Sequence, residues 1–325
     1  MKPLLSILMP CYNSEKYLKQ SLESVLNQTL KEIEVICVND GSTDSTLKIL
    51  KEYQSNDDRV KIINKENSGY GDSLNKALDI VQGEYVGIVE PDDYIKPEMF
   101  KTLYDASVKY SLDKCRCLFH DVYTDRITIN KFPAVPKNIV FSPLEKKEIF
   151  FVSPSIWACI YKTSLIKDNN IRFLNTPGAS YQDTSFNFKT NALAKRIMFI
   201  DKALHFYRRE SGGNSVTNKA KVEFVQIEWS EIYNFVKSQN GNLDCLYPTM
   251  AMVLLNSYDW NYKRIADCFK SSFMFSWWKE TVQRHVLGQI KFKELSPFYK
   301  KVEYVVLFMP FLYGRFSRND RKKIW

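Results

Sequence analysis

The sequence has few histidines and no long apolar run. Histidine occurs only at His120, His205 and His285 among 325 residues. This scarcity argues against a histidine-based zinc site or a Ser-His-Asp triad. The longest apolar stretches, near residues 249–255 and 304–313, fall well short of the roughly 18 residues that span a bilayer. The sequence therefore predicts no transmembrane helix.

The cysteines do not form the pattern of a disulfide framework. There are seven, an odd number, scattered from Cys11 to Cys268, without the density of a small secreted scaffold. The first residues reach Pro10 before they could form the apolar centre of a signal peptide. Both observations favour a cytoplasmic protein. The alternation of Cys115 and Cys117 fits a strand with two buried cysteines better than a metal site.

Two common nucleotide-binding motifs are also missing. No Gly-x-x-x-x-Gly-Lys-Ser/Thr sequence occurs, and the stretch that begins at Gly69 lacks the third glycine of the dinucleotide fingerprint. A P-loop and a nicotinamide-type site are thereby disfavoured. The composition, with 45% hydrophobic residues and a net charge of +9, instead indicates a folded core and an anionic partner.

The first hundred residues alternate between two hydrophobic periods. Short β-rich apolar runs occur at residues 4–9, 33–38, 60–63 and 85–89, and helical patterns separate them. This alternation predicts an α/β fold with a mostly parallel sheet flanked by helices. A further strand is expected at 115–123. After about residue 219 the pattern becomes helical, which predicts a catalytic domain at 1–218 and a helical region at 219–325.

Polar residues follow the predicted strands at the edge where parallel sheets bind ligands. The sharpest group is Glu90-Pro91-Asp92-Asp93, because three crowded carboxylates repel one another unless a cation compensates. Mg²⁺ or Mn²⁺ held by one or two carboxylates and phosphate oxygens would do so. The alternative is a solvated acidic turn before a helix near residue 97.

Two earlier strand ends carry residues suited to a nucleotide. Asp40 is placed to accept a hydrogen bond from a base or a ribose hydroxyl, and Tyr12 could stack on a nucleobase. The alternative for Tyr12 is packing in the core. Residues 42–44 after Asp40 also fit a simple turn and helix cap.

Four motifs in order resemble the family 2 glycosyltransferases of the GT-A fold. They are Ser6 to Asn13, Val38 to Asp44, Glu66 to Gly69 with Asn75 and Ala77, and Gly83 to Asp93. The resemblance implies a nucleotide-sugar donor, with Tyr12 and Asp40 at a uracil-type base and Asp92 at the ribose. It also places Pro10, Asn13, Asn67 and Gly69 on the donor side, and gives the metal to Asp92 and Asp93. Glu90 stands where the family often has Asp and would assist the metal or ribose.

The block from Trp157 onward resembles the acceptor side of bacterial polysaccharide transferases in this family. Its hallmark appears as Tyr181-Gln182-Asp183-Thr184, with Gln182 in place of the usual Glu. The resemblance makes Asp183 the catalytic base, which an alcohol acceptor needs at neutral pH. It places Trp157, Gln182 and His205 near the acceptor. The alternative for Asp183 is the N-cap of a helix at 184–194.

Arg208 and the glycine-bearing stretch at 212–217 resemble a family segment that closes over the donor. Arg208 would contact the diphosphate through two hydrogen bonds. Two arginines on a surface loop are alternatively solvated.

The C-terminal third holds aromatic residues, including Trp277, Trp278, Phe308 and Phe311, and a basic end. It could lie at a membrane interface and serve a lipid-linked acceptor. A helical subdomain packed on the catalytic domain, or a dimer contact, is the alternative. The membrane interpretation would place the protein on the inner face of the cytoplasmic membrane.

The motifs together predict an inverting glycosyltransferase that extends a bacterial surface glycan, such as a capsule or lipooligosaccharide, from a UDP-sugar. A nucleotidyltransferase would share the sheet and the acidic site, but the first strand end lacks its glycine-rich basic loop. A non-catalytic nucleic-acid-binding protein would use the charge of +9. The acidic strand ends argue against nucleic acid as a partner.

Overall fold

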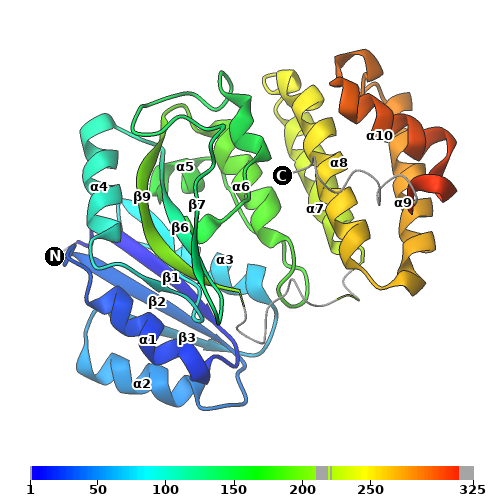
Figure 1. Cartoon of the computed structure of the whole chain (residues 1–325). Helices are drawn as coiled ribbons and strands as arrows, with labels where there is room; N and C mark the ends of the chain where they lie inside the picture. Colours follow the sequence, from blue (N-terminus) through cyan, green and yellow to red (C-terminus); the bar gives the residue numbers. More distant parts are fainter. Residues whose placement is uncertain (1, 210–218, 220–221, 315–325) are drawn as a thin grey trace. The chain divides into compact units, whose positions relative to one another are not determined.

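The computed structural model describes residues 2–209, 219 and 222–314 of the chain, which forms two compact units, Met1–Asn214 and Ser215–Trp325 (Figure 1). The predicted domain boundary at residue 218 and the predicted donor-closing stretch at 212–217 lie outside the described residues. The basic residues after 314 lie outside them as well. Each unit is described separately below.

The first half of unit 1 is a parallel sheet, and it confirms the predicted alternation of strands and helices. Its strands lie in the order β3-β2-β1-β4. They span Leu5–Cys11 (β1), Ile33–Asp40 (β2), Val60–Lys65 (β3) and Tyr85–Ile88 (β4). Helices α1 (Glu15–Leu26), α2 (Thr46–Asn56) and α3 (Tyr70–Ile80) connect them. Strands β1 and β2 are buried along their whole length, as expected for strands covered on both faces.

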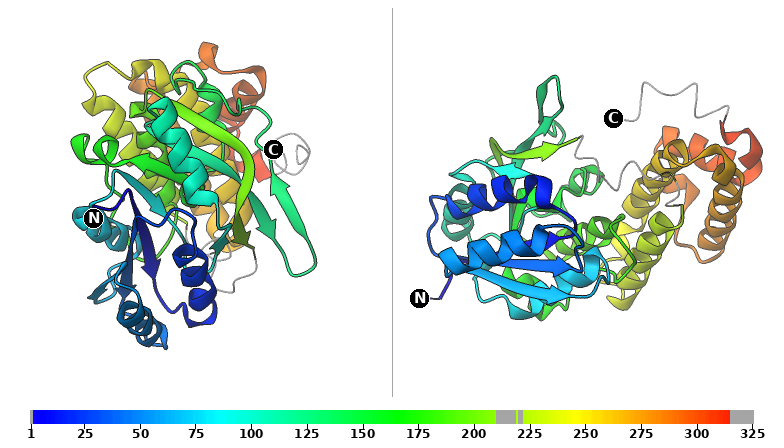
Figure 2. Two further views of the ribbon diagram at one scale, coloured as in Figure 1. Left: turned by 90° about the vertical axis from the view of Figure 1, so that its left-hand side faces the viewer. Right: turned by 90° about the horizontal axis from the view of Figure 1, so that it is seen from below.

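The second half of the sheet contains antiparallel pairs that the sequence did not predict. Strand β8 (Cys159–Lys162) runs antiparallel to both β4 and β6 (Lys114–Val122). Strand β9 (Ile197–Arg208) lies parallel to β6 and also pairs with the short β5 (Tyr94–Ile95). Strand β7 (Ile127–Asn130) extends β6 into a hairpin that projects from the unit (Figure 2). Because β9 reaches β5, it holds the segment that follows Asp92 and Asp93.

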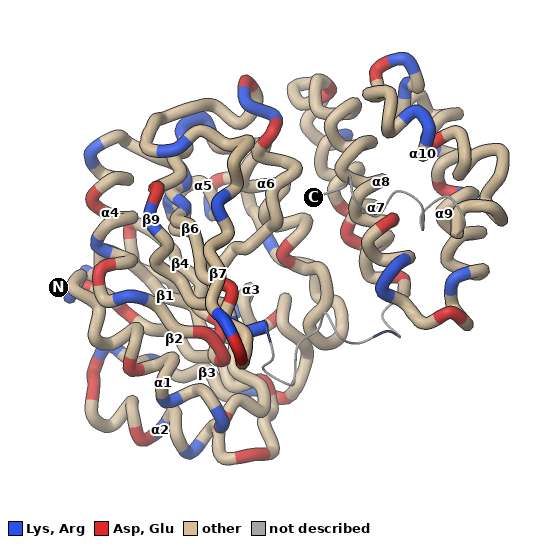
Figure 3. The backbone as a smooth tube through the Cα atoms, in the orientation of Figure 1, with Lys and Arg blue, Asp and Glu red and all other residues tan. Residues whose placement is uncertain are grey.

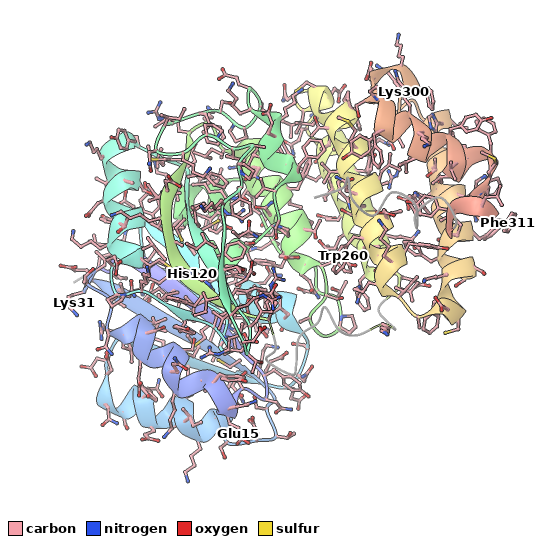
Figure 4. All side chains as sticks on the ribbon, in the orientation of Figure 1. Glu15, Lys31, His120, Trp260, Lys300 and Phe311 are labelled. Carbon is pink, nitrogen blue, oxygen red and sulfur yellow. The ribbon has the colours of Figure 1, made fainter. Side chains whose placement is uncertain are left out.

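Three further helices and two short 3₁₀ turns complete the described part of unit 1. The helices are α4 (Met99–Tyr110), α5 (Thr163–Asp168) and α6 (Gln182–Leu193), and the turns are η1 (Lys147–Phe151) and η2 (Ile156–Ala158). On β6, Cys115 and Cys117 are buried as predicted. His120, labelled in Figure 4, stacks on Phe206 with ring centroids 4.5 Å apart. These residues therefore pack the sheet.

Unit 2 is helical, as the sequence predicts. Its helices are α7 (Phe224–Ser238), α8 (Tyr247–Arg264), α9 (Asp267–Val286) and α10 (Pro297–Phe308), with 3₁₀ turns η4 (Asp244–Leu246), η5 (Phe292–Glu294) and η6 (Pro310–Leu312). Large aromatic side chains fill its core, among them Trp229, Tyr258 and Trp277. No helix in the described part of the chain is both long and apolar enough to cross a membrane.

Candidate active site

The loops after β1 and β2 are tied to each other at the carboxyl edge of the sheet. Asn13 adopts a left-handed conformation with φ 47°. Its N–H donates to Ser42 Oγ at 3.0 Å, and its Oδ1 accepts the N–H of Thr43 at 2.8 Å. Tyr12 projects from this pair of loops with 52% of its surface exposed. The alternative expected from the sequence, that Tyr12 packs in the core, is therefore wrong. A nucleobase could therefore stack on Tyr12, although its donor role stays a prediction.

Asp40 is the last residue of β2, and its buried carboxylate lies at the N-terminal end of α3. Its Oδ1 accepts the N–H of Ser68 at 2.9 Å and the ammonium of Lys65, and its Oδ2 accepts the N–H of Gly69 at 3.0 Å. Lys65 also pairs with Asp72 at 3.0 Å. Any contact with a base would use a remaining lone pair of the carboxylate. Lys65 was missed in the sequence, yet it ends β3 directly beside Asp40 in the parallel register.

The first turn of α3 lies against the chain that leads to α6. Gly69 has φ +100°, and a Cβ there would lie 2.7 Å from the carbonyl oxygen of Thr176. A Cβ on Gly71 would lie 2.0 Å from the carbonyl oxygen of Leu174. Gly69 therefore also has a structural role, because only glycine lets α3 approach the backbone at Thr176 this closely. Its donor-side role stays a prediction.

The other two donor-side residues predicted from the motifs differ in accessibility. Asn67 is exposed next to Gly69, whereas Pro10 is buried within β1 beside Val38. Pro10 therefore shapes the strand end, and a donor could reach it only through its neighbours.

Glu90 is held by a tyrosine that the sequence motifs did not single out. The hydroxyl of Tyr70, the first residue of α3, donates to Glu90 Oε1 at 2.5 Å. Burial, and then the charges of Asp92 and Asp183, raise the pKa of Glu90 to about 8. The N–H of Tyr70 donates to the carbonyl oxygen of Gly178 at 3.0 Å, so the same tyrosine brings Glu90 near the segment that leads to Asp183.

Asp93 lies inside the protein, which corrects the prediction that it holds a metal. Its side chain has no exposed surface. Its Oδ1 accepts the N–H of Arg208 at 2.8 Å, and its Oδ2 lies 3.8 Å from Nε2 of His205. Residues 90–93, the acidic turn, are closed by a hydrogen bond from the N–H of Asp93 to the carbonyl oxygen of Glu90 at 3.1 Å. Asp93 leaves this turn with its side chain in the interior, where it anchors the turn to β9.

His205 and Trp157 are also interior residues, and their predicted contact with an acceptor is wrong. His205 has no exposed surface, and burial lowers its pKa to about 3. Its ring lies against Trp157, with centroids 4.2 Å apart, and Trp157 stacks on Tyr207 at 4.9 Å. These rings pack against one another in the interior, with His205 beside Asp93.

The side chain of Arg208 stabilises the acidic turn through hydrogen bonds and ring contacts. One guanidinium nitrogen donates to the carbonyl oxygen of Asp92 at 2.6 Å and another to Gln20 Oε1 at 2.6 Å. The guanidinium also lies between the rings of Tyr17 and Tyr94, 4.7 Å and 4.6 Å from their centroids. The predicted phosphate contact would have to use its remaining N–H groups.

Asp183 lies in the first turn of α6. The helix begins at Gln182, after Tyr181 in the left-handed region with φ 64°. Asp183 is thus inside the helix, so the predicted alternative of an N-cap is wrong. Burial raises the pKa of Asp183 to about 6. A carboxyl group with this pKa can accept a proton and is still largely ionised at neutral pH.

Gln182 supports the loop before Asp183 and does not reach an acceptor. It is 1% exposed. Its amide nitrogen donates to Thr176 Oγ1 at 2.7 Å and to the carbonyl oxygen of Gly178 at 3.2 Å, and its Oε1 accepts the N–H of Ser180. The predicted acceptor contact of Gln182 is therefore wrong, because these hydrogen bonds occupy the amide.

The carboxylates that face the crevice fit a divalent ion only in part. In the described ranges no three His, Cys, Asp or Glu side chains are placed to hold a metal by themselves. Asp92 and Glu90 nevertheless offer hard oxygen ligands, and a bound cation would offset the burial and the neighbouring charges that raise the pKa of Glu90. One or two carboxylates completed by phosphate oxygens and water is a usual Mg²⁺ arrangement.

Comparison with known proteins assigns these features to a family. The family model "Glycosyl transferase family 2" matches residues 6–172. The uncharacterized glycosyltransferase EpsJ of Bacillus subtilis is 31% identical over 67% of this chain and 64% of its own length. GlyG, a glycosyltransferase of Streptococcus pneumoniae, is 32% identical over 65% of this chain and 73% of its own. The chain therefore spans just under two thirds of the length of EpsJ.

The similarity to one solved structure covers residues of both units. The crystal structure of Staphylococcus aureus TarS residues 1–349 in complex with UDP-GlcNAc has a TM-score of 0.60 and 22% identity, covering 93% of this chain and 90% of that one. This likeness shows the fold, a GT-A fold, as predicted. The chain, with the family's motifs gathered at one edge of that sheet, belongs to glycosyl transferase family 2.

Proposed function

We propose that this protein is an inverting glycosyltransferase that moves a sugar from a UDP-sugar to a hydroxyl group of a bacterial surface glycan. The observation that carries the proposal is the placement of Asp183. Burial raises the pKa of its carboxyl group to about 6. Tyr70 links the acidic turn to the chain before Asp183, because its hydroxyl donates to Glu90 and its N–H donates to the carbonyl oxygen of Gly178. A base is thus close to the turn at which a family 2 donor would bind.

The reaction needs one carboxylate. Asp183 takes the proton of the acceptor hydroxyl while the oxygen forms a bond to the anomeric carbon. The bond from that carbon to the diphosphate breaks on the opposite side, so the configuration inverts and the nucleoside diphosphate leaves. A divalent ion, when bound, would stabilise the charge of the leaving diphosphate. Asp92 and Glu90 are the residues proposed to hold it.

The donor is proposed to lie along the strand ends from Tyr12 to Asp92. Tyr12 would stack on the base, Asp40 would accept a hydrogen bond from it, and Asp92 would meet the ribose. A uridine nucleotide is favoured because the structurally similar TarS has been crystallised with UDP-GlcNAc and with UDP. Tyr12 has the exposure that stacking requires.

The acceptor is proposed to be a surface polysaccharide or lipooligosaccharide, free or lipid-linked. A part of this chain is 42% identical to the chondroitin synthase of Escherichia coli, over 32% of this chain and 15% of that one. That enzyme's name denotes glycan synthesis, which supports the class of acceptor. A protein with this task would work at the cytoplasmic side of the membrane.

A donor panel tests the proposal. The full chain is incubated with Mn²⁺ or Mg²⁺, one nucleotide sugar at a time, and an oligosaccharide acceptor, and release of the nucleoside diphosphate is measured. We expect UDP release from one UDP-sugar, and loss of it when EDTA removes the ion. Release of pyrophosphate from a nucleoside triphosphate and a sugar phosphate would instead show a nucleotidyltransferase. Salt-dependent nucleic-acid binding with no turnover of any donor would refute both activities.

A further inference from the structure

Unit 2 exposes a group of aromatic side chains that its core does not use. Phe275 on α9, Tyr304 and Phe308 on α10, and Phe311 in η6 are 62%, 49%, 68% and 93% exposed. Figure 4 labels Phe311, which extends outward beyond the end of α10. We call these four residues and Trp278 the aromatic patch. Exposed aromatics in such a group commonly mark a binding surface.

Contacts join the members of the aromatic patch into one surface. Phe275 and Trp278 have ring centroids 5.9 Å apart, and the indole N–H of Trp278 donates to the carbonyl oxygen of Leu307 at 3.1 Å. That hydrogen bond brings α9 beside the last turn of α10. There Phe308 contacts Tyr304, with centroids 4.9 Å apart. The patch thus spans two helices and continues to Phe311, three residues later.

Helix α9 continues the apolar surface toward its C-terminal end. Val282 and Val286 are exposed and lie one and two turns beyond Trp278 on the same helical face. The opposite face of α9 carries Phe273 and Trp277, which are buried in the unit. Helix α9 is therefore apolar on two sides, and the core covers only one of them.

Basic side chains border the patch, and the nearest acids are turned inward. Lys279 follows Trp278, and Lys300 and Lys301 lie one turn before Tyr304. Figure 3 shows Lys and Arg, in blue, along α10. Glu303 is buried and pairs with His285 at 2.8 Å, while Glu280 pairs with Arg284. The outward charge around the patch is consequently positive.

The sequence that follows η6 adds to this charge. Residues 315–325 contain five Lys or Arg and one Asp, and they lie outside the described part of the chain. The aromatic patch is thus followed directly by a strongly basic segment.

We propose that the aromatic patch inserts into an anionic lipid surface, with Lys279, Lys300 and Lys301 among the headgroups. A second copy of the chain fits less well. A two-fold contact through this patch would bring the same lysines against each other, and like charges at an interface repel. An anionic membrane provides an apolar layer for the rings and negative charge for the lysines.

Vesicle sedimentation tests this proposal with the full chain. Vesicles of phosphatidylcholine alone are compared with vesicles that contain phosphatidylglycerol, at low and high salt. We expect the protein to sediment with the anionic vesicles, and Phe308→Ala with Phe311→Ala to weaken that partition by at least about tenfold. The reversal of charge by Lys300→Glu with Lys301→Glu should weaken it as well and reduce its dependence on salt.

The control removes equally exposed apolar groups elsewhere. Ile127 and Ile129 on β7 are 56% and 48% exposed, and their replacement by Ala should leave sedimentation unchanged. Equal losses in the control and the Phe308/Phe311 variant would overturn the proposal, as would a wild-type chain that stays in solution. So would a dimer in light scattering that the Phe308/Phe311 variant converts to a monomer without any vesicle binding.

The result is independent of the proposed transfer activity. Release of nucleoside diphosphate in solution, with a soluble acceptor, should be unchanged in the Phe308/Phe311 variant, because both substitutions lie in unit 2 and the residues of the candidate site belong to unit 1. Loss of vesicle binding with retained turnover therefore tests the membrane surface alone.

Discussion

The replacement Asp183→Asn tests the catalytic base most directly. The amide has nearly the same shape as the carboxyl group but cannot take a proton from the acceptor. General base catalysis typically contributes about 10²–10⁴-fold to a rate. We expect kcat to fall by that amount while the Kd for UDP, measured by calorimetry, stays within about twofold, because the proposed base acts on the acceptor and not on the nucleotide.

The pH dependence gives a second, quantitative form of the same test. Burial raises the pKa of Asp183 to about 6, and the ionised carboxylate is the active form. Its fraction is then about 0.1 at pH 5 and about 0.9 at pH 7, so kcat/KM should rise about tenfold over this range. The sign is decisive, because an acid at this position would make the rate fall instead.

The assay follows UDP release between pH 5 and 8 over a range of acceptor concentrations, in the presence of Mn²⁺, so that it gives both kcat and kcat/KM. Asp168→Asn is the matched control, since this substitution makes the same chemical change at an exposed position, the last residue of α5. The reasoning is refuted if Asp183→Asn keeps more than a tenth of wild-type kcat, or if the wild-type profile is flat across pH 6.

Three further changes probe the surroundings of the site. Tyr70→Phe removes the donor to Glu90; we expect a loss of about tenfold in kcat/KM, and a double-mutant cycle with Glu90→Gln should show that the two losses do not add. Asp93→Ala should lower the free energy of unfolding by about 1–3 kcal/mol, because a buried backbone N–H loses its acceptor; an unchanged urea midpoint would contradict this. Gly71→Ala places a methyl group 2.0 Å from the carbonyl oxygen of Leu174. The midpoint of thermal unfolding and the affinity for UDP should therefore both decrease. A variant with wild-type values for both would show that the contact can relax.

The parallel half of the fold could be predicted from sequence because its signals are local. The apolar runs at 33–38, 60–63 and 85–89 start where β2, β3 and β4 start, and the helices between them are amphipathic. The second half could not be predicted in the same way. The antiparallel position of β8 between β4 and β6 depends on pairing between distant segments, which leaves no period in the sequence.

The site was predictable where a residue's position follows from its strand end. Tyr12, Asp40 and Asp92 lie at the expected edge of the sheet. Asp93, Trp157 and His205 were misplaced because a motif gives the order of residues and not the direction of their side chains. Asp93 precedes β5 and His205 lies on β9, and where these two strands pair both side chains are buried. Tyr70 was missed because its partner Glu90 is twenty residues away and is brought to it only by the fold.

The contact between α3 and the chain before α6 limits how this enzyme can be recombined. The N–H of Tyr70 donates to the carbonyl oxygen of Gly178 at 3.0 Å, and the side-chain amide of Asn75 bonds both Phe173 and Asn175. Segments that would hold the donor and the acceptor are thereby interlocked, although a hundred residues separate them. A chimera that exchanged residues 173–182 with those of a relative would need to import the matching α3 to keep its two substrates aligned.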